Sequence, residues 1–176
     1  TPGSPRDPNL PSTVSALEPE TGKVLWPYHS KLNIHGRGLA YWPGDNEHDP
    51  EIVFGTTLGG KLIALNAKTG TPVAGFGDNG IVDLKTPDVM NGIPSAPYDM
   101  VAPPSIYRNL VILNSRVQEE PVKGASGDVR AFDVRTGKHV WTFHTIPRPG
   151  EKFHDTWEGD SWKQRSGTNI WNMLTV

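Results

Sequence analysis

Short apolar runs that alternate with polar positions recur along the chain and predict β-strands. The runs rich in β-branched and aromatic residues are residues 51–57, 61–67, 109–117, 128–132 and 138–146. The first two flank the turn Leu58-Gly59-Gly60, the next two flank a longer loop, and the last contains Val140 and Trp141. Helical periodicity is scarce, so the pattern predicts an all-β chain without a substantial helix.

A seven-residue motif occurs three times without gaps. Its copies are residues 16–22 (Ala-Leu-Glu-Pro-Glu-Thr-Gly), 64–70 (Ala-Leu-Asn-Ala-Lys-Thr-Gly) and 131–137 (Ala-Phe-Asp-Val-Arg-Thr-Gly). An acidic or amide side chain at the third position can accept hydrogen bonds from the turn backbone, and the final glycine can adopt the positive φ of the reversal. Trp26 and Trp141 follow ten residues after their alanines, where the second copy has Ala74.

The spacing of the copies predicts a β-propeller. Gly22 and Gly70 are 48 residues apart, which suits a four-stranded blade, and Gly70 and Gly137 are 67 apart, which suits a blade with an insertion in the Pro-rich residues 86–104. The alternative is three unrelated hairpins, because Thr-Gly turns are common.

Counted in blades, the chain divides into four parts: residues 1–36 end one blade, 37–85 and 86–146 form two more, and 147–176 form a loop and the start of the next. Propellers close with about four to eight blades, so about three cannot close a ring. Because the chain also begins without a methionine or a leader, we expect it to be processed or excerpted from a longer protein.

Composition excludes several kinds of function. Seventeen basic and nineteen acidic residues give a formal charge of −2, with no basic block for nucleic acid. The absence of cysteine excludes disulfides, thiolate metal sites and thiol nucleophiles. No apolar run approaches the ~18–20 residues of a membrane span. Nineteen glycines and seventeen prolines agree with a turn-dense β architecture.

Motifs outside the repeat resemble the dehydrogenases that use pyrroloquinoline quinone (PQQ). They are residues 36–45 (Gly-Arg-Gly-Leu-Ala-Tyr-Trp-Pro-Gly-Asp), 155–163 (Asp-Thr-Trp-Glu-Gly-Asp-Ser-Trp-Lys) and 166–171 (Ser-Gly-Thr-Asn-Ile-Trp). Residues 75–80 and 144–151 look most like the glucose-dehydrogenase-like branch. The resemblance implies part of an eight-bladed propeller of four-stranded antiparallel sheets, with PQQ and Ca²⁺ on its axis.

The resemblance also implies contacts with the cofactor. Arg37 would pair with a PQQ carboxylate, which a guanidinium fork suits, although it could also be a surface arginine. Trp171 would stack beneath the PQQ ring, or else dock blades as a core tryptophan; the neighbouring Ile170 leaves its register open by one residue. Thr168 and Asn169 would bond the quinone edge. His35 would form the roof, which is a disulfide in methanol-type relatives, unless it is simply solvated.

The expected metal ligand is Glu119, whose carboxylate suits Ca²⁺, with Glu120 as the competing choice and an exposed acidic loop as the alternative. The catalytic aspartate and the asparagine ligand of the family are expected beyond Val176. The chain alone is therefore expected to be inactive.

The resemblance thus implies a quinoprotein oxidoreductase that oxidises an alcohol or sugar hydroxyl with PQQ as electron acceptor and Ca²⁺ as Lewis acid. Electrons would leave to a cytochrome or a membrane quinone, in the periplasm and possibly at the membrane. The alternative is a non-catalytic propeller that serves as a binding or assembly scaffold, because one fold supports both kinds of function.

Overall fold

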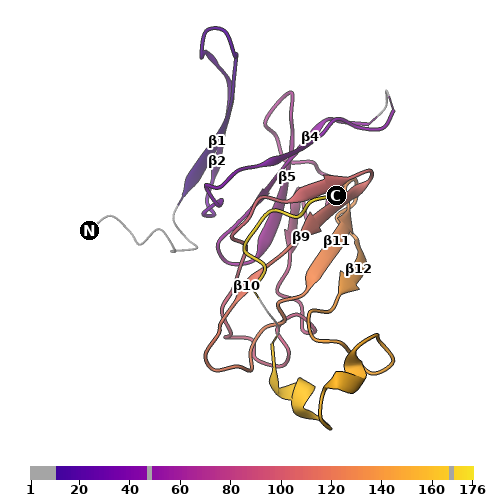
Figure 1. Ribbon diagram of the computed structural model, residues 1–176. Helices are drawn as coiled ribbons and strands as arrows, with labels where there is room; N and C mark the ends of the chain where they lie inside the picture. The colour runs from indigo at the N-terminus through magenta and orange to yellow at the C-terminus, as the bar shows by residue number, and fades with distance from the viewer. Residues whose placement is uncertain (1–10, 47–48, 167–168) are drawn as a thin grey trace, which may run out of the picture.

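The computed structural model describes residues 11–46, 49–166 and 169–176, which form β-strands and two short 3₁₀-helices (Figure 1). The strands of the first half are β1 (Ser12–Leu17), β2 (Val24–Ser30), β3 (Ala40–Trp42), β4 (Ile52–Thr56), β5 (Lys61–Asn66) and β6 (Ile81–Asp83). The strands of the second half are β7 (Tyr98–Asp99), β8 (Ser105–Tyr107), β9 (Leu110–Leu113), β10 (Arg116–Val117), β11 (Val129–Asp133) and β12 (His139–Phe143). The 3₁₀-helices are η1 (His154–Thr156) and η2 (Ser161–Gln164).

Two four-stranded antiparallel sheets dominate the structure. One has the order β3-β4-β5-β6 and the other β8-β9-β11-β12, so each is built from strands in sequence order, with β10 left out of the second. The hairpin β1–β2 precedes them, and β7 pairs with β10 in a separate two-stranded ribbon. Figure 1 shows the hairpin, the sheet with β4 and β5, and the sheet with β9 and β11 following one another through the molecule. The all-β prediction with four-stranded blades is confirmed.

The three motif copies form the same turn. The motif glycine donates its N–H to the third motif residue at 2.8 Å (Glu18), 2.8 Å (Asn66) and 2.9 Å (Asp133). The three glycines have φ of 70°, 72° and 70°. Oδ1 of Asn66 and of Asp133 also accepts two backbone N–H groups of its own turn, as predicted. This shared geometry identifies the copies as one repeated unit.

One apolar core joins the two sheets. It contains Ile52, Phe54 and Leu62 of the first sheet together with Val111 and Phe132 of the second. It also includes Phe76, from the connection between β5 and β6, whose ring lies 5.5 Å from that of Phe54. The sheets therefore pack on one another, as neighbouring blades do, and the apolar area removed from water holds them together.

The sequence-predicted strand 109–117 is two strands. β9 ends at Leu113, and the chain re-enters a pairing only at Arg116, where β10 pairs with β7 outside the main sheet. Asn114 does not continue the strand: its Nδ2 donates to the carbonyl of Asn172 at 2.5 Å. The apolar pattern could not show this break, because it depends on a segment almost 60 residues away.

Because the strands are antiparallel, the connections between them lie at two opposite ends of the sheets. The motif turns and the β3–β4 and β8–β9 connections share one end. The longer connections β2–β3, β6–β8 and β9–β11, and the segment that follows β12, leave from the other end. The predicted site residues all lie in this second group of segments. We call this end of the sheets the loop end.

Candidate functional site

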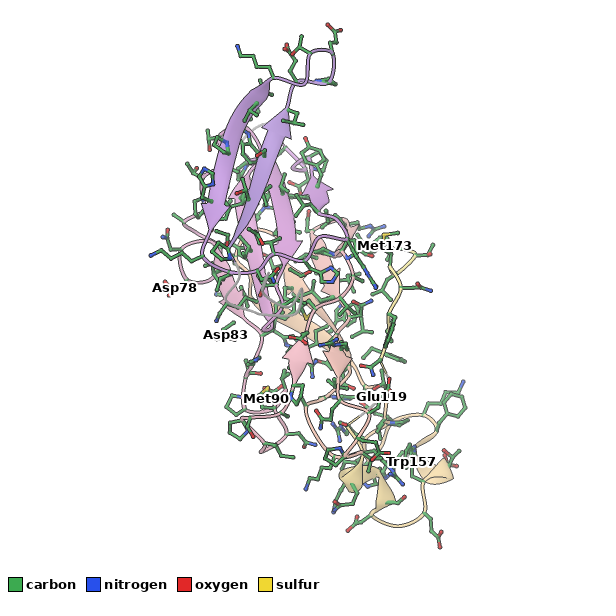
Figure 2. The ribbon with its side chains drawn as sticks, turned by 90° about the vertical axis from the view of Figure 1, so that its left-hand side faces the viewer. Asp78, Asp83, Met90, Glu119, Trp157 and Met173 are labelled. Atoms are coloured by element: carbon green, nitrogen blue, oxygen red, sulfur yellow. The ribbon has the colours of Figure 1, made fainter. Side chains whose placement is uncertain are left out.

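A cleft opens at the loop end, with a volume of about 310 Å³. Its lining residues come from three segments of the chain: Pro97, Arg116, Val117, Gln118, Glu119, Asn169 and Trp171. An adjoining hollow of about 480 Å³ shares four of them and adds Trp157 and Arg165 from the segment after β12. Figure 2 shows Glu119 and Trp157 at the same end of the molecule. Small-molecule sites commonly have about 300–1,000 Å³ and a few polar groups on apolar walls, which matches this pair of hollows.

Trp171 forms part of the wall of both hollows, and its side chain is 54% exposed. The preceding Ile170 instead packs against the cluster of Ile112, Val129 and Ala131 on the second sheet. The fold therefore directs the tryptophan, and not its neighbour, towards the cleft. An exposed indole at this place offers a flat apolar face to a planar ligand.

Asn169 connects the segment that carries Trp171 to the loop between β9 and β11. Its Oδ1 accepts the backbone N–H of Val117 at 2.7 Å, and its Nδ2 lies 3.4 Å from Oε1 of Glu119. Glu119 lines both hollows, and within the described parts of the chain its carboxylate receives only this long hydrogen bond. Glu120 lines neither hollow, so the cleft distinguishes the two glutamates.

Arg37 and His35 lie beside the cleft, on the connection between β2 and β3. The guanidinium of Arg37 donates to the carbonyl of Val101 at 3.2 Å, and the backbone N–H of Arg37 donates to Nδ1 of His35 at 3.3 Å. Neither residue lines the two hollows that contain Trp171. Burial lowers the pKa of the His35 imidazole, and the guanidinium groups of Arg37 and Arg116 lower it further. The imidazole is thus held in its neutral form near two cations.

Several residues of the site were not singled out from the sequence as site residues, among them Arg116, Gln118, Trp157 and Arg165. Gln118 is fixed by a bond from Nε2 to the carbonyl of Lys123 at 2.8 Å, and its buried Oε1 has no partner among the described residues. A side chain on Gly124 would overlap the Gln118 amide. The signals in the sequence were the position of Arg116 and Gln118 directly before Glu119 and the place of Trp157 within the motif of residues 155–163.

The segment after β12 closes one side of the site. Ser166 donates its N–H to the carbonyl of Val122 at 3.0 Å, and its own carbonyl accepts from Gly127 at 2.7 Å. These bonds fasten residues 157–166 to the loop that carries Glu119, which explains how Trp157 and Arg165 reach the hollow. Thr168, the remaining predicted site residue, lies outside the described residues.

The acidic groups of the site are few. Among residues 11–46, 49–166 and 169–176, no three His, Asp or Glu side chains gather in a way that could hold a metal ion. The cleft itself offers the single carboxylate of Glu119. Hard cations such as Ca²⁺ take six to eight oxygens, so Glu119 could supply only part of such a shell. In the same described parts of the chain, no helix has the length and hydropathy needed to cross a membrane.

Residues 9–176 match the family model of the PQQ glucose/ethanol/alcohol dehydrogenase β-propeller domain. The chain belongs to the PQQ-dependent dehydrogenase family. This places the indole, guanidinium and carboxylate groups of the loop end in a family that uses a planar, carboxylate-bearing cofactor.

Characterised members of the PQQ-dependent dehydrogenase family align with most of the chain. Methanol dehydrogenase [cytochrome c] subunit 1 of Paracoccus denitrificans is 32% identical over 189 residues, which cover 91% of this chain and 27% of the relative. Quinoprotein glucose dehydrogenase of Gluconobacter oxydans is 33% identical over 154 residues, which cover 77% of this chain and 19% of the relative. The solved quinohemoprotein alcohol dehydrogenase ADHIIG of Pseudomonas putida HK5 has a TM-score of 0.66 at 25% identity, over 92% of this chain and 23% of that one. The chain therefore spans about a quarter or less of the length of these PQQ-dependent dehydrogenases.

Proposed function

We propose that this chain forms one side of the cofactor site of a quinoprotein dehydrogenase that oxidises an alcohol or sugar hydroxyl, with PQQ as electron acceptor and Ca²⁺ as Lewis acid. Family membership supports PQQ-dependent dehydrogenation as the kind of reaction. The observation that carries the proposal is the cleft in which the exposed indole of Trp171 faces the same space as the carboxylate of Glu119 and the guanidinium of Arg116, which come from a segment about 50 residues earlier.

The residues of the cleft fit PQQ in shape and charge. Trp171 offers the half-exposed face on which a fused planar ring would stack. PQQ carries three carboxylates, and Arg37 next to the cleft provides a fork of donors that matches a carboxylate. His35, kept neutral by burial and by its cationic neighbours, would cover the ring without adding charge. When bound, PQQ supplies the quinone that takes up two electrons as a CH–OH group becomes a carbonyl.

Asn169 and Glu119 would orient the polar edge of the cofactor and its metal ion. The Asn169 amide is already fixed by Val117, so it holds the Glu119 carboxylate within the cleft. We infer that Glu119 supplies one oxygen ligand to Ca²⁺ and that the other ligands come from PQQ and from residues of the full-length protein outside this chain. The ion would polarise the cofactor's carbonyl oxygen, where negative charge develops.

The same proposal covers partners and location. The names of two relatives, methanol dehydrogenase [cytochrome c] and alcohol dehydrogenase (quinone), support a cytochrome or a membrane quinone as electron acceptor. We place the reaction in the periplasm, at or near the membrane, as the family resemblance suggests.

Reconstitution of a full-length protein that contains this chain tests the proposal. The apo-protein would be titrated with PQQ in CaCl₂, and dye-linked turnover measured with glucose and small alcohols. Arg37→Ala should raise the half-saturating PQQ concentration by roughly 10- to 100-fold, because this is the change in affinity expected when one charge-assisted hydrogen bond is lost. Trp171→Ala should also raise it, through lost stacking area.

Trp162→Phe is a matched control, because Trp162 lines neither hollow and stacks on His154 instead. A full-length protein that neither binds PQQ nor turns over any alcohol or sugar would contradict the proposal and favour a scaffold propeller. The 176-residue chain alone should show no PQQ-dependent turnover above a boiled control, since Arg37 would hold the cofactor on a wet surface where ion pairs contribute little.

A further inference from the structure

Arg116 is the most strongly positioned cation of the cleft. It lies in β10 directly opposite Asp99 of β7, and its guanidinium forms an ion pair with the Asp99 carboxylate. The other carboxylate oxygen of Asp99 accepts the N–H of Gly59 at 3.0 Å. The side chains of Arg116 and Asp99 are only 23% and 19% exposed, so the pair is sheltered from bulk water. Both oxygens of Asp99 are thus occupied, which fixes the direction of the guanidinium.

The guanidinium of Arg116 keeps donors available to a ligand. A guanidinium carries five N–H donors, and among the described residues Arg116 makes one side-chain hydrogen bond, from Nη2 to Asp99. The same side chain lines the cleft together with Glu119, Asn169 and Trp171. If the only role of Arg116 were to pair β10 with β7, its side chain would not have to line the cleft.

Arg116 and Arg37 contact the same short segment of the chain. Arg37 binds the carbonyl of Val101, and Arg116 binds the carboxylate of Asp99, two residues earlier. Burial lowers the pKa of the His35 imidazole, and both cations lower it further, as positive charges near the ring do. The carboxylates near these two arginines are Asp99, which is paired with Arg116, and Glu119, which lines the cleft.

We propose that Arg116, oriented by Asp99, is a second carboxylate-binding residue of the cofactor site, beside Arg37. This inference rests on the proposed function, since it concerns how this chain holds PQQ. Two separate guanidinium groups suit a ligand with several carboxylates, because each can bind one in the bidentate geometry that arginine favours. The sheltered position of Arg116 makes its bond to a carboxylate worth more than an exposed ion pair.

The test is equilibrium binding to the full-length apo-protein, followed by quenching of tryptophan fluorescence and needing no turnover. Two ligands are compared: PQQ and its trimethyl ester, which keeps the ring and lacks the charges. Arg116→Gln should raise the Kd for PQQ by about 10- to 100-fold and the Kd for the ester by less than about threefold. Arg116→Lys should recover part of the affinity for PQQ.

Arg108→Gln is the matched control. It also removes one positive charge, but at the β8–β9 turn, at the end of the second sheet opposite the loop end, where Arg108 lies over the Tyr107 ring. Its Kd for PQQ should change by less than about twofold, because the charge is exposed and distant from the cleft.

Three outcomes decide between the readings. An equal loss of affinity for both ligands in Arg116→Gln would mean that Arg116 only supports the fold, and would overturn the inference. Unchanged PQQ binding in Arg116→Gln, with tight binding in the wild type, would also overturn it and leave the proposed function intact. A wild-type protein that binds neither ligand would instead refute the proposed function itself.

Discussion

Trp26 and Trp141 hold equivalent places in two repeats, yet their surroundings differ. Each lies opposite the motif alanine in its hairpin, Ala16 or Ala131. Trp26 donates its ring N–H to the carbonyl of Ala67 at 2.9 Å and covers Gly70, both in the motif turn of the next repeat. Trp141 is 37% exposed beside an apolar hollow, and its indole donates to no group among the described residues.

The difference shows that the anchor belongs to the junction between repeats and not to its own hairpin. The hairpins with Trp26 and Trp141 form alike, but only the first is followed within the chain by another motif turn. The middle repeat also contacts the motif turn that follows it, but through residues other than tryptophan. Phe76 and Val82 lie against Gly137, and the N–H of Gly77 donates to the carbonyl of Thr136 at 2.9 Å. Gly70 and Gly137 are thus each covered by the repeat before them.

The largest effect is expected from breaking the middle junction. Phe76 is fully buried in the core that joins the two sheets. Phe76→Ala should lower the free energy of unfolding by about 3–5 kcal/mol, through lost burial and the cavity left behind. Urea denaturation of the full-length protein measures it. A loss below ~1 kcal/mol would show that the two sheets are not held together at this junction.

Gly70→Ala tests the contact beneath Trp26. The added methyl group would overlap the indole, and φ of 72° disfavours any side chain, so we expect a loss of about 2–4 kcal/mol. Gly22→Ala is the control, because Gly22 has nearly the same φ, 70°, and nothing within 4 Å of the new methyl group. It should cost about 1–2 kcal/mol, the conformational part alone. Equal losses in the two variants would mean that Trp26 gives no docking energy.

Trp26→Phe and Trp141→Phe sharpen the comparison of the anchors. Trp26→Phe should cost about 1–2 kcal/mol, for a lost hydrogen bond and reduced contact area. In the full-length protein we expect a similar cost for Trp141→Phe, because a following repeat would cover it. In the 176-residue chain, Trp141→Phe should change the unfolding free energy by less than about 0.5 kcal/mol. A larger loss there would show that Trp141 already has its partner.

The smallest effects are expected within the turns. Asn66→Ala and Asp133→Ala should each cost about 1 kcal/mol, because each side chain accepts two backbone N–H groups. Glu18→Ala should cost less, about 0.3 kcal/mol, since the Glu18 carboxylate accepts, among the described residues, only from the hydroxyl of Thr21 on an exposed turn. Thermal unfolding of the three variants ranks them. If Glu18→Ala lowers the unfolding free energy as much as the other two variants, the side-chain hydrogen bonds to the turn backbone do not stabilise their turns.

Part of the candidate site could be predicted from the sequence. The resemblance pointed to Glu119, Asn169 and Trp171, and the fold gathers these three in one cleft, while their roles in binding stay predictions. Arg37 and His35 lie beside that cleft and not in its walls. Arg116 was overlooked because its importance depends on Asp99, a partner 17 residues away that only the pairing of β7 with β10 reveals.

The sequence by itself determined the features that depend on near neighbours in the chain. The period-two runs set the strands, and the motif with its glycine and its Asn66 or Asp133 acceptor sets the turns, because these bonds close within a few residues. The tertiary structure alone decided which surfaces meet. The break after Leu113, the docking of Trp26 and the cleft at the loop end all join residues far apart in sequence, and their contacts depend on where whole sheets pack.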